Sequence, residues 1–136
     1  MPTRRSFSAA VHVPNMGVLI LGGVNGWLGD NLTAVEILRS EEGDLTGEKC
    51  TWSAISSMLM PRIMPLAAYH NNRIFVTEMS TTVNFEMLSL SGGQLGQWTR
   101  LDVRNQFRDN FKPWSLANFH GRLLLVGSSS LTIAFI

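Results

Sequence analysis

The sequence has little cysteine, few charges and no long hydrophobic run, and each shortage excludes a class of protein. Only one cysteine, Cys50, occurs among the 136 residues. This excludes an intrachain disulfide and a cysteine-only metal site, and it suits a reducing compartment. The main apolar runs, at residues 18–21 and 123–126, fall far short of the ~18 residues of a membrane helix. We therefore expect a cytoplasmic protein that does not cross a membrane.

The charges are few and nearly balanced. They make up 15% of the residues, and 11 basic against 10 acidic side chains give a net charge of +1, which creates no general attraction for nucleic acid. A basic series at four-residue spacing would share one helical face, but like charges at that spacing disfavour the helix, and two nearby aspartates offset half of the charge. The series consists of Arg100, Arg104, Arg108 and Lys112. We expect no nucleic-acid partner.

Short runs of β-forming residues occupy most of the chain and recur in the same order. Residues with period-two or continuous apolar patterns predict strands, and Gly-, Asn- and Ser-rich turns separate them. The first set comprises residues 7–13, 18–21, 33–38 and 51–55; the second comprises 66–70, 73–77, 83–88 and 97–101; the third comprises 116–119, 122–126 and 131–135. Sets of four strands that recur every ~40–50 residues are typical of propeller blades.

One segment also fits a helix. Leu28, Leu32, Val35 and Leu38 have the spacing of an apolar helical stripe. The matching segment of the second set, residues 83–88, alternates with period two, and the repeat therefore favours a strand.

Several landmarks recur in one order in the first two sets. The first set contains Met1-Pro2-Thr3-Arg4, Gly22-Gly23, Glu36 and Trp52, and the second contains Met60-Pro61-Arg62, Glu86 and Trp98. In these landmarks the sequence resembles the kelch-repeat family over about residues 1–101. Thr77-Glu78 and Val126-Gly127 stand where the second and third sets would carry the paired glycine.

The resemblance implies an all-β fold, a partial kelch-type β-propeller of about two and three-quarter four-stranded antiparallel blades. The single domain, residues 1–136, would consist of a first repeat (1–56), a second (57–101) and a degenerate or truncated third (102–136). Because propellers have ~4–8 blades, we expect a fragment of a longer protein, a truncated gene product, or a subunit that finds its missing blades in another copy or a partner. Unpaired blade edges would favour self-association. The repeat landmarks Gly22, Gly23, Glu36, Trp52, Glu86 and Trp98 are expected to be structural, with both tryptophans packed between blades.

The resemblance also implies a binding rim. In the family, the connections between blades and the loops after the glycine pair hold protein partners. The candidate rim residues are Asn25, Trp27, Asp30 and Asn31, then Ser57, Met58 and Arg62, and finally Arg104, Arg108 and Trp114. Trp27 is the strongest candidate, because it lies in a Gly- and Asn-rich loop where no strand accounts for it, and tryptophan dominates interface energetics.

No set of residues predicts catalysis, a cofactor or a metal site. His70 and His120 lie at turns, where we expect solvated side chains, and no carboxylate or cysteine stands at ligand spacing. The acidic stretch at residues 41–48 is expected to be a solvated connector.

We therefore expect a non-catalytic protein–protein interaction module. The resemblance implies the substrate-recognition part of a kelch adaptor for a cullin-type ubiquitin ligase. Two alternatives stay open: an actin-associated, cytoskeletal kelch protein, and a fragment of a galactose-oxidase-like propeller enzyme.

Overall fold

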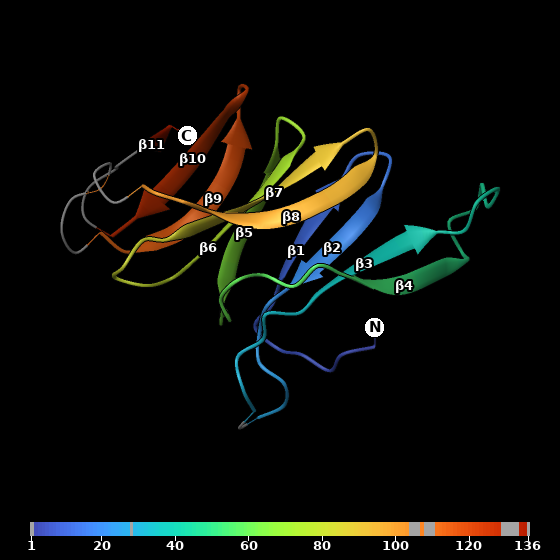
Figure 1. The fold of residues 1–136 in the computed structure, drawn as a ribbon, viewed down its shortest axis with the longest axis horizontal. Helices are drawn as coiled ribbons and strands as arrows, with labels where there is room; N and C mark the ends of the chain where they lie inside the picture. The colour runs from blue at the N-terminus through green and yellow to red at the C-terminus, as the bar shows by residue number, and fades with distance from the viewer. Residues whose placement is uncertain (1, 28, 104–106, 108–110, 129–133, 136) are drawn as a thin grey trace.

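The chain folds into antiparallel β-sheets, as a computed structural model shows (Figure 1). The structure describes residues 2–27, 29–103, 107, 111–128 and 134–135, and contains no helix within them. Consequently, no described helix is long and apolar enough to cross a membrane. The all-β prediction is confirmed. The helical alternative around Val35 is wrong, because this residue begins a strand that pairs on both sides.

Three sheets account for the strands that the structure describes. Sheet I contains β1 (Ala9–Val13), β2 (Gly17–Leu21), β3 (Val35–Ser40) and β4 (Cys50–Ile55) in chain order. Sheet II contains β5 (Pro65–His70), β6 (Arg73–Glu78), β7 (Phe85–Ser91) and β8 (Gln94–Leu101), again in chain order. Sheet III has the order β11-β10-β9, with β9 (Pro113–Phe119), β10 (Arg122–Gly127) and the short β11 (Ala134–Phe135).

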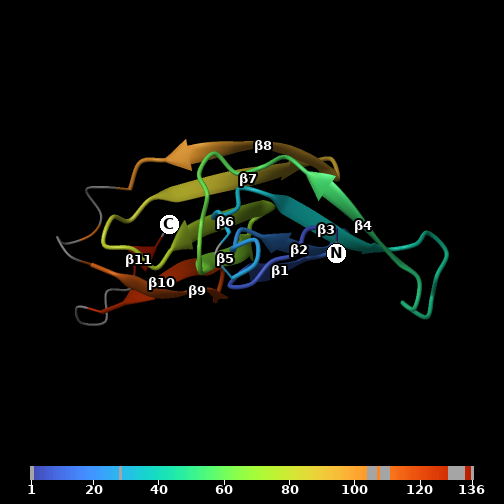
Figure 2. The same cartoon turned by 90° about the horizontal axis from the view of Figure 1, so that it is seen from below.

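The three sheets form an open stack. Their first strands are neighbours, since β1 contacts β5 and β5 contacts β9. Figure 2 shows β1, β5 and β9 along one side of the molecule, and the last strands β4 and β8 along the opposite side. Successive connections in an antiparallel sheet alternate between the two ends of the strands. The β2–β3, β4–β5 and β6–β7 connections therefore lie at one end of the stack.

Strand register shows that sheets I and II repeat residue by residue. Leu38 pairs with Val18 on one side and with Trp52 on the other, and Leu88 pairs in the same way with Ile74 and Trp98. Glu36 faces Ile20, as Glu86 faces Val76. By the same register, Gly22 stands level with Glu78 and not with Thr77, so the sequence alignment of the glycine pair was wrong by one residue.

Each sheet turns its two faces toward different neighbours, because successive side chains in a strand point to opposite sides. We call the face toward the sheet next along the chain the leading face, and the face toward the preceding sheet the trailing face. The leading face of sheet I packs on the trailing face of sheet II in one buried cluster, which includes Val11, Leu19, Ile37, Ile74, Val76, Leu88 and Trp98. The leading face of sheet II packs on the trailing face of sheet III in a second cluster, which includes Ala68, Phe75, Phe85, Leu123 and Leu125.

The two repeat tryptophans differ in burial. Trp98 is 4% exposed in the first cluster, and its indole N–H donates to the carbonyl oxygen of Ser56 at 2.8 Å. Trp52 is only half-buried and belongs to neither cluster. Packing between sheets thus describes Trp98 but not Trp52, because Trp52 lies on the trailing face of sheet I, which has no sheet before it among the described residues.

Candidate partner-binding rim

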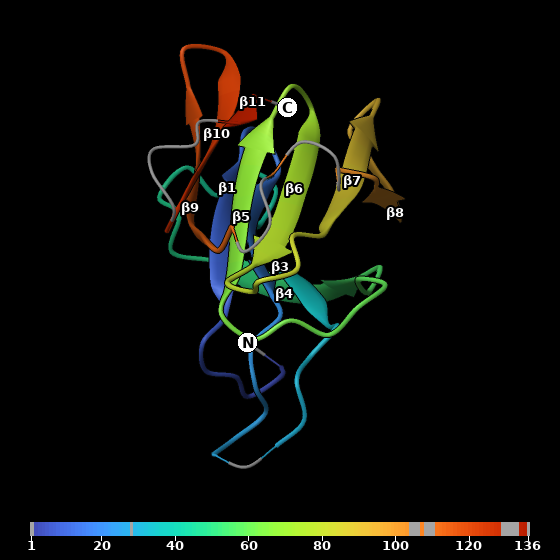
Figure 3. The ribbon, with the colours of Figure 1, turned by 90° about the vertical axis from the view of Figure 1, so that its left-hand side faces the viewer.

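The loop between β2 and β3, residues 22–34, projects from the end of the stack near the N-terminus (Figure 3). A stalk holds it. Val24 and Ser6 exchange two backbone hydrogen bonds of 2.9 and 3.0 Å, and the amide of Leu32 donates to the carbonyl of Gly23 at 2.8 Å. Beyond this stalk the side chain of Trp27 is 97% exposed. Asn25, Asp30 and Asn31 are exposed as well.

The glycine pair allows the loop to leave the sheet. Gly22 and Gly23 have φ values of +63° and +94°, a region that side chains disfavour. A Cβ on Gly23 would overlap the backbone oxygen of Ser6, and one on Gly22 would lie 2.7 Å from the carbonyl oxygen of Arg62. Other parts of the backbone therefore occupy the space that a side chain would need.

The connection between β4 and β5 packs against this loop. The amide of Gly23 donates to the carbonyl of Arg62 at 2.7 Å, and the amide of Met58 donates to the carbonyl of Thr33 at 2.9 Å. The structure thus brings together two of the segments that were predicted to form the rim. Ser57 in this connection is exposed.

Met58 and Arg62, however, do not present their side chains at this rim. Met58 is 3% exposed and packs in the cluster between sheets I and II, and Arg62 has no exposed surface. Both predictions were wrong, because the backbone of the connection lies at the surface while these side chains point inward.

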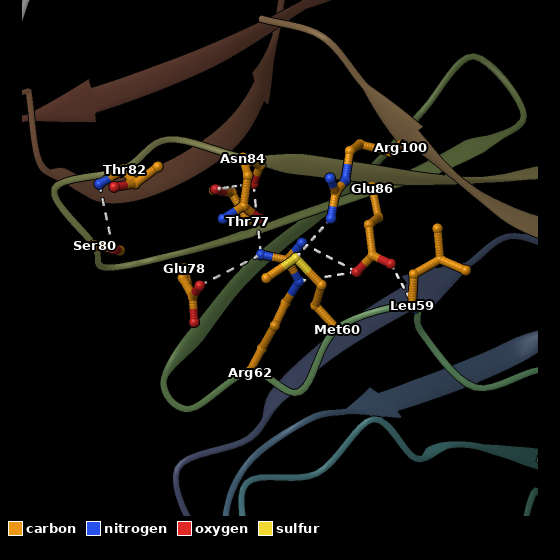
Figure 4. Close-up of polar contacts among 10 residues, drawn as sticks. All are labelled: Leu59, Met60, Arg62, Thr77, Glu78, Ser80, Thr82, Asn84, Glu86 and Arg100. Carbon is orange, nitrogen blue, oxygen red and sulfur yellow. Dashed lines mark hydrogen bonds and ion pairs between the residues drawn. The ribbon is translucent and has the colours of Figure 1, made fainter. Parts of the chain in front are cut away.

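Arg62 is held in a buried network (Figure 4). Its Nε donates to Oε2 of Glu86 at 3.1 Å, and Nη2 lies 3.0 Å from the same oxygen. Nη1 donates to the carbonyl of Asn84 at 3.5 Å and lies 3.9 Å from a carboxylate oxygen of Glu78. The backbone N–H of Leu59 donates to the other carboxylate oxygen of Glu86. Glu86 thus fixes the connection that enters sheet II.

The first repeat contains the equivalent network. Arg5 donates to Oε2 of Glu36 at 2.8 Å and to the carbonyls of Gly22 and Ala34, and its side chain has no exposed surface. The N–H of Thr3 donates to Oε1 of Glu36 at 3.0 Å. The sequence landmarks at the heads of the two sets contain Arg4 and Arg62, whereas the structure makes Arg5 the residue equivalent to Arg62.

Backbone conformation confirms this equivalence. Two residues after Arg5 and Arg62, the residues Phe7 and Met64 have φ values of +55° and +50°. Positive φ is uncommon for side chains of this size, and neither residue marks such a turn in the sequence. The sequence analysis also missed the buried Arg–Glu pairs, because the sequence pattern does not distinguish a buried arginine from an exposed one.

A groove lies at the end of sheet II where the β4–β5 and β6–β7 connections meet, and the sequence analysis did not predict it. It has a volume of about 430 Å³, and its lining comes from three segments that are distant in the sequence. Met60 comes from the β4–β5 connection, Thr82 to Asn84 come from the β6–β7 connection, and Arg100 to Asp102 come from the end of β8. Each segment contributes only a few residues, so no single stretch of sequence could have indicated it.

The remaining rim candidates are split between described and undescribed residues. Trp114, at the start of β9, is 54% exposed. Arg104 and Arg108 lie outside the described residues, and so does the middle of the predicted basic series.

No three His, Cys, Asp or Glu side chains among the described residues are grouped to hold a metal ion. His70 is 6% exposed, which corrects the expectation of a solvated turn histidine. In the acidic connector, hydrogen bonds from the Thr46 hydroxyl and the Lys49 amide lower the pKa of the Asp44 carboxyl below its ordinary value.

The chain was compared with protein-family models and with curated proteins. No family model matches it, and no curated protein matches it either.

Proposed function

We propose that this chain is a non-catalytic protein-interaction module that forms part of a kelch-type β-propeller. Three observations support this assignment: the residue-by-residue repeat of sheets I and II, the face-to-face stacking of successive sheets, and the neighbouring first strands β1, β5 and β9. All three are expected of adjacent propeller blades. Of the landmark residues that resemble kelch repeats, Glu36 and Trp52 occupy the positions of Glu86 and Trp98 in the other sheet.

The exposed ring of Trp27 is the observation that carries the proposal. An indole with 97% of its surface in water is kept at the tip of a loop whose stalk is fixed by paired backbone hydrogen bonds. Burying such a ring against a partner removes a large apolar area from water at little cost in conformational entropy. Tryptophans in this setting are frequent interface hot spots.

The groove beside the rim would accept part of the same partner. Its lining combines the methionine and leucine side chains of Met60 and Leu101 with the polar Thr82 and with Arg100 and Asp102. Mixed apolar and polar linings of this kind suit a protein surface or a peptide segment. The buried Arg62–Glu86 pair lies beneath this region and stabilises the connection that contributes Met60.

The partner class follows from the resemblance. We propose that the module recognises substrates for a cullin-type ubiquitin ligase in the cytoplasm, as kelch adaptors do. Actin association is the outcome to be distinguished from it, because cytoskeletal kelch proteins have the same repeat.

Affinity capture tests this proposal. The immobilised chain, its Trp27→Ala variant and its Leu45→Ala variant are compared for the proteins that they retain from a lysate, and each retained protein is then titrated in purified form. Leu45 is the matched control, because it is fully exposed in the β3–β4 connection, away from the rim. We expect Trp27→Ala to weaken binding of the partner by about 2 kcal/mol or more, and Leu45→Ala to leave the affinity unchanged.

The identity of the captured protein decides the rest. A ubiquitin-ligase substrate supports the adaptor role, and actin supports the cytoskeletal one. Equal affinity of the wild type and Trp27→Ala for a confirmed partner would remove Trp27 and its loop from the binding surface.

A further inference from the structure

Among the described residues, the stack ends in two largely apolar faces that pack on no further sheet. On the trailing face of sheet I, the side chains of Val18, Ile20, Leu38 and Trp52 are partly exposed and belong to neither buried cluster. On the leading face of sheet III, Phe119 is 58% exposed and Val126 is 39% exposed, and Ala117 and Leu124 share that face by register. Both faces lie at the outer surfaces of the stack.

The trailing face of sheet I repeats a surface that is buried elsewhere in the same chain. By register, Val18, Ile20, Leu38 and Trp52 are equivalent to Ile74, Val76, Leu88 and Trp98. All four of the latter are at most 4% exposed, because the leading face of sheet I covers them. The trailing face of sheet I is therefore built to receive a leading face.

The leading face of sheet III matches the leading face of sheet I at four apolar positions, and the polar Arg122 and Ser115 share the face by register. Leu124 pairs with Ala117, as Leu19 pairs with Val11, and Phe119 and Val126 are equivalent to Val13 and Leu21 in the same register. Val11, Val13, Leu19 and Leu21 are the residues that cover sheet II, and all are buried. The chain thus carries both halves of one further interface of the type that it already makes internally.

We propose that two copies of this chain associate head to tail, the trailing face of sheet I in each copy packing on the leading face of sheet III in the other. Both internal contacts between sheets join a leading face to a trailing face, and the second copy supplies the missing member at each end. Two stacks of three sheets give six, which lies within the ~4–8 sheets that close a propeller ring. Contacts between unlike faces close into a ring only when the rotation allows it.

This inference differs from association through strand edges, because the surfaces involved are sheet faces. It is also independent of the partner bound at the rim: the two faces contain neither Trp27 nor the groove residues. Failure of the dimer would leave rim binding intact, and failure of Trp27 to bind would leave the dimer intact.

Sedimentation velocity of the purified chain over a range of concentrations tests the proposal. The wild type is expected to reach twice the monomer mass at about 10 µM or below. Ile20→Asp on one face, or Phe119→Asp on the other, should each weaken association by about 100-fold, because each places an unpaired charge in both interfaces. Leu45→Asp, at an exposed site outside both faces, is expected to dimerise as the wild type does.

Mixing the two variants distinguishes head-to-tail pairing from other arrangements. In a mixed dimer both changes fall in one interface, and the other interface is wild-type. The mixture should therefore regain dimers that neither variant forms alone. Circular dichroism spectra that match the wild type serve as the folding control, and Ala117→Asp replaces Phe119→Asp if that variant does not fold.

Three results would overturn the proposal. They are a wild type that stays monomeric at all concentrations, a dimer that Ile20→Asp leaves unchanged, and masses that grow beyond the dimer in an open series.

Discussion

Arg62 and Glu86 bring opposite charges into a region where neither side chain has exposed surface. Removing charges from water is costly, and the pair offsets this cost only while both members are present. Glu86→Gln would leave the guanidinium charged and buried without its counter-charge. We expect this change to lower the free energy of unfolding by about 3–5 kcal/mol.

Urea denaturation of a small set of variants measures this. The double variant Arg62→Met with Glu86→Leu should lose less stability than either single change, because it leaves no buried charge unpaired. Glu48→Gln, in the exposed connector, is the control and should behave as the wild type. An effect of Glu86→Gln below about 1 kcal/mol would mean that water reaches the pair.

The β2–β3 loop depends on a close approach of backbone that only glycine permits. Gly23 has φ +94° and no room for a Cβ, whereas Gly43 has φ +83° and open space around it. Gly43→Ala should therefore lower the free energy of unfolding only by the cost of a side chain in the left-handed conformation, about 1–2 kcal/mol. Gly23→Ala should lower the free energy of unfolding by at least about 1 kcal/mol more, because the backbone at Ser6 must move to make room for the Cβ.

Thermal unfolding of both variants isolates the steric part of that cost, since the conformational part is common to them. Equal destabilisation would show that the loop and residue 6 can separate without penalty, and that the stalk does not hold Trp27 in place.

The stack has a centre and two outer layers, and they should differ in local stability. Sheet II is covered on both faces, and Ile74, Phe75 and Val76 in β6 are all buried. Sheets I and III each pack on another described sheet through one face only. Local opening frees backbone amides most readily where few apolar contacts must break.

Hydrogen exchange of the dilute chain therefore should be slowest in β6 and faster in β4 and β9. Concentrating the sample to the dimer is expected to slow exchange in the outer sheets and to leave β6 as it was. Exchange in β4 that is as slow as in β6 in the dilute sample would contradict a stack held together by its central sheet.

The sequence by itself determined the strands, their order and their repeat. Alternation of side chains and turn residues such as Asn71-Asn72 act locally, so a run of letters predicts a strand that the fold then keeps. The repeat also favoured a strand over a helix around Val35, because the matching segment at residues 83–88 has the pattern of a strand.

Only the tertiary structure decided which of these residues meet water. Met58 directly follows the exposed Ser57 and Arg62 lies in the same connection, yet both side chains are buried, because sheet II packs over them. Trp52 and Trp98 occupy the same place in two repeats, and only Trp98 has a preceding sheet to cover it. Burial is a property of surfaces that come together from distant parts of the chain, and local pattern does not determine it.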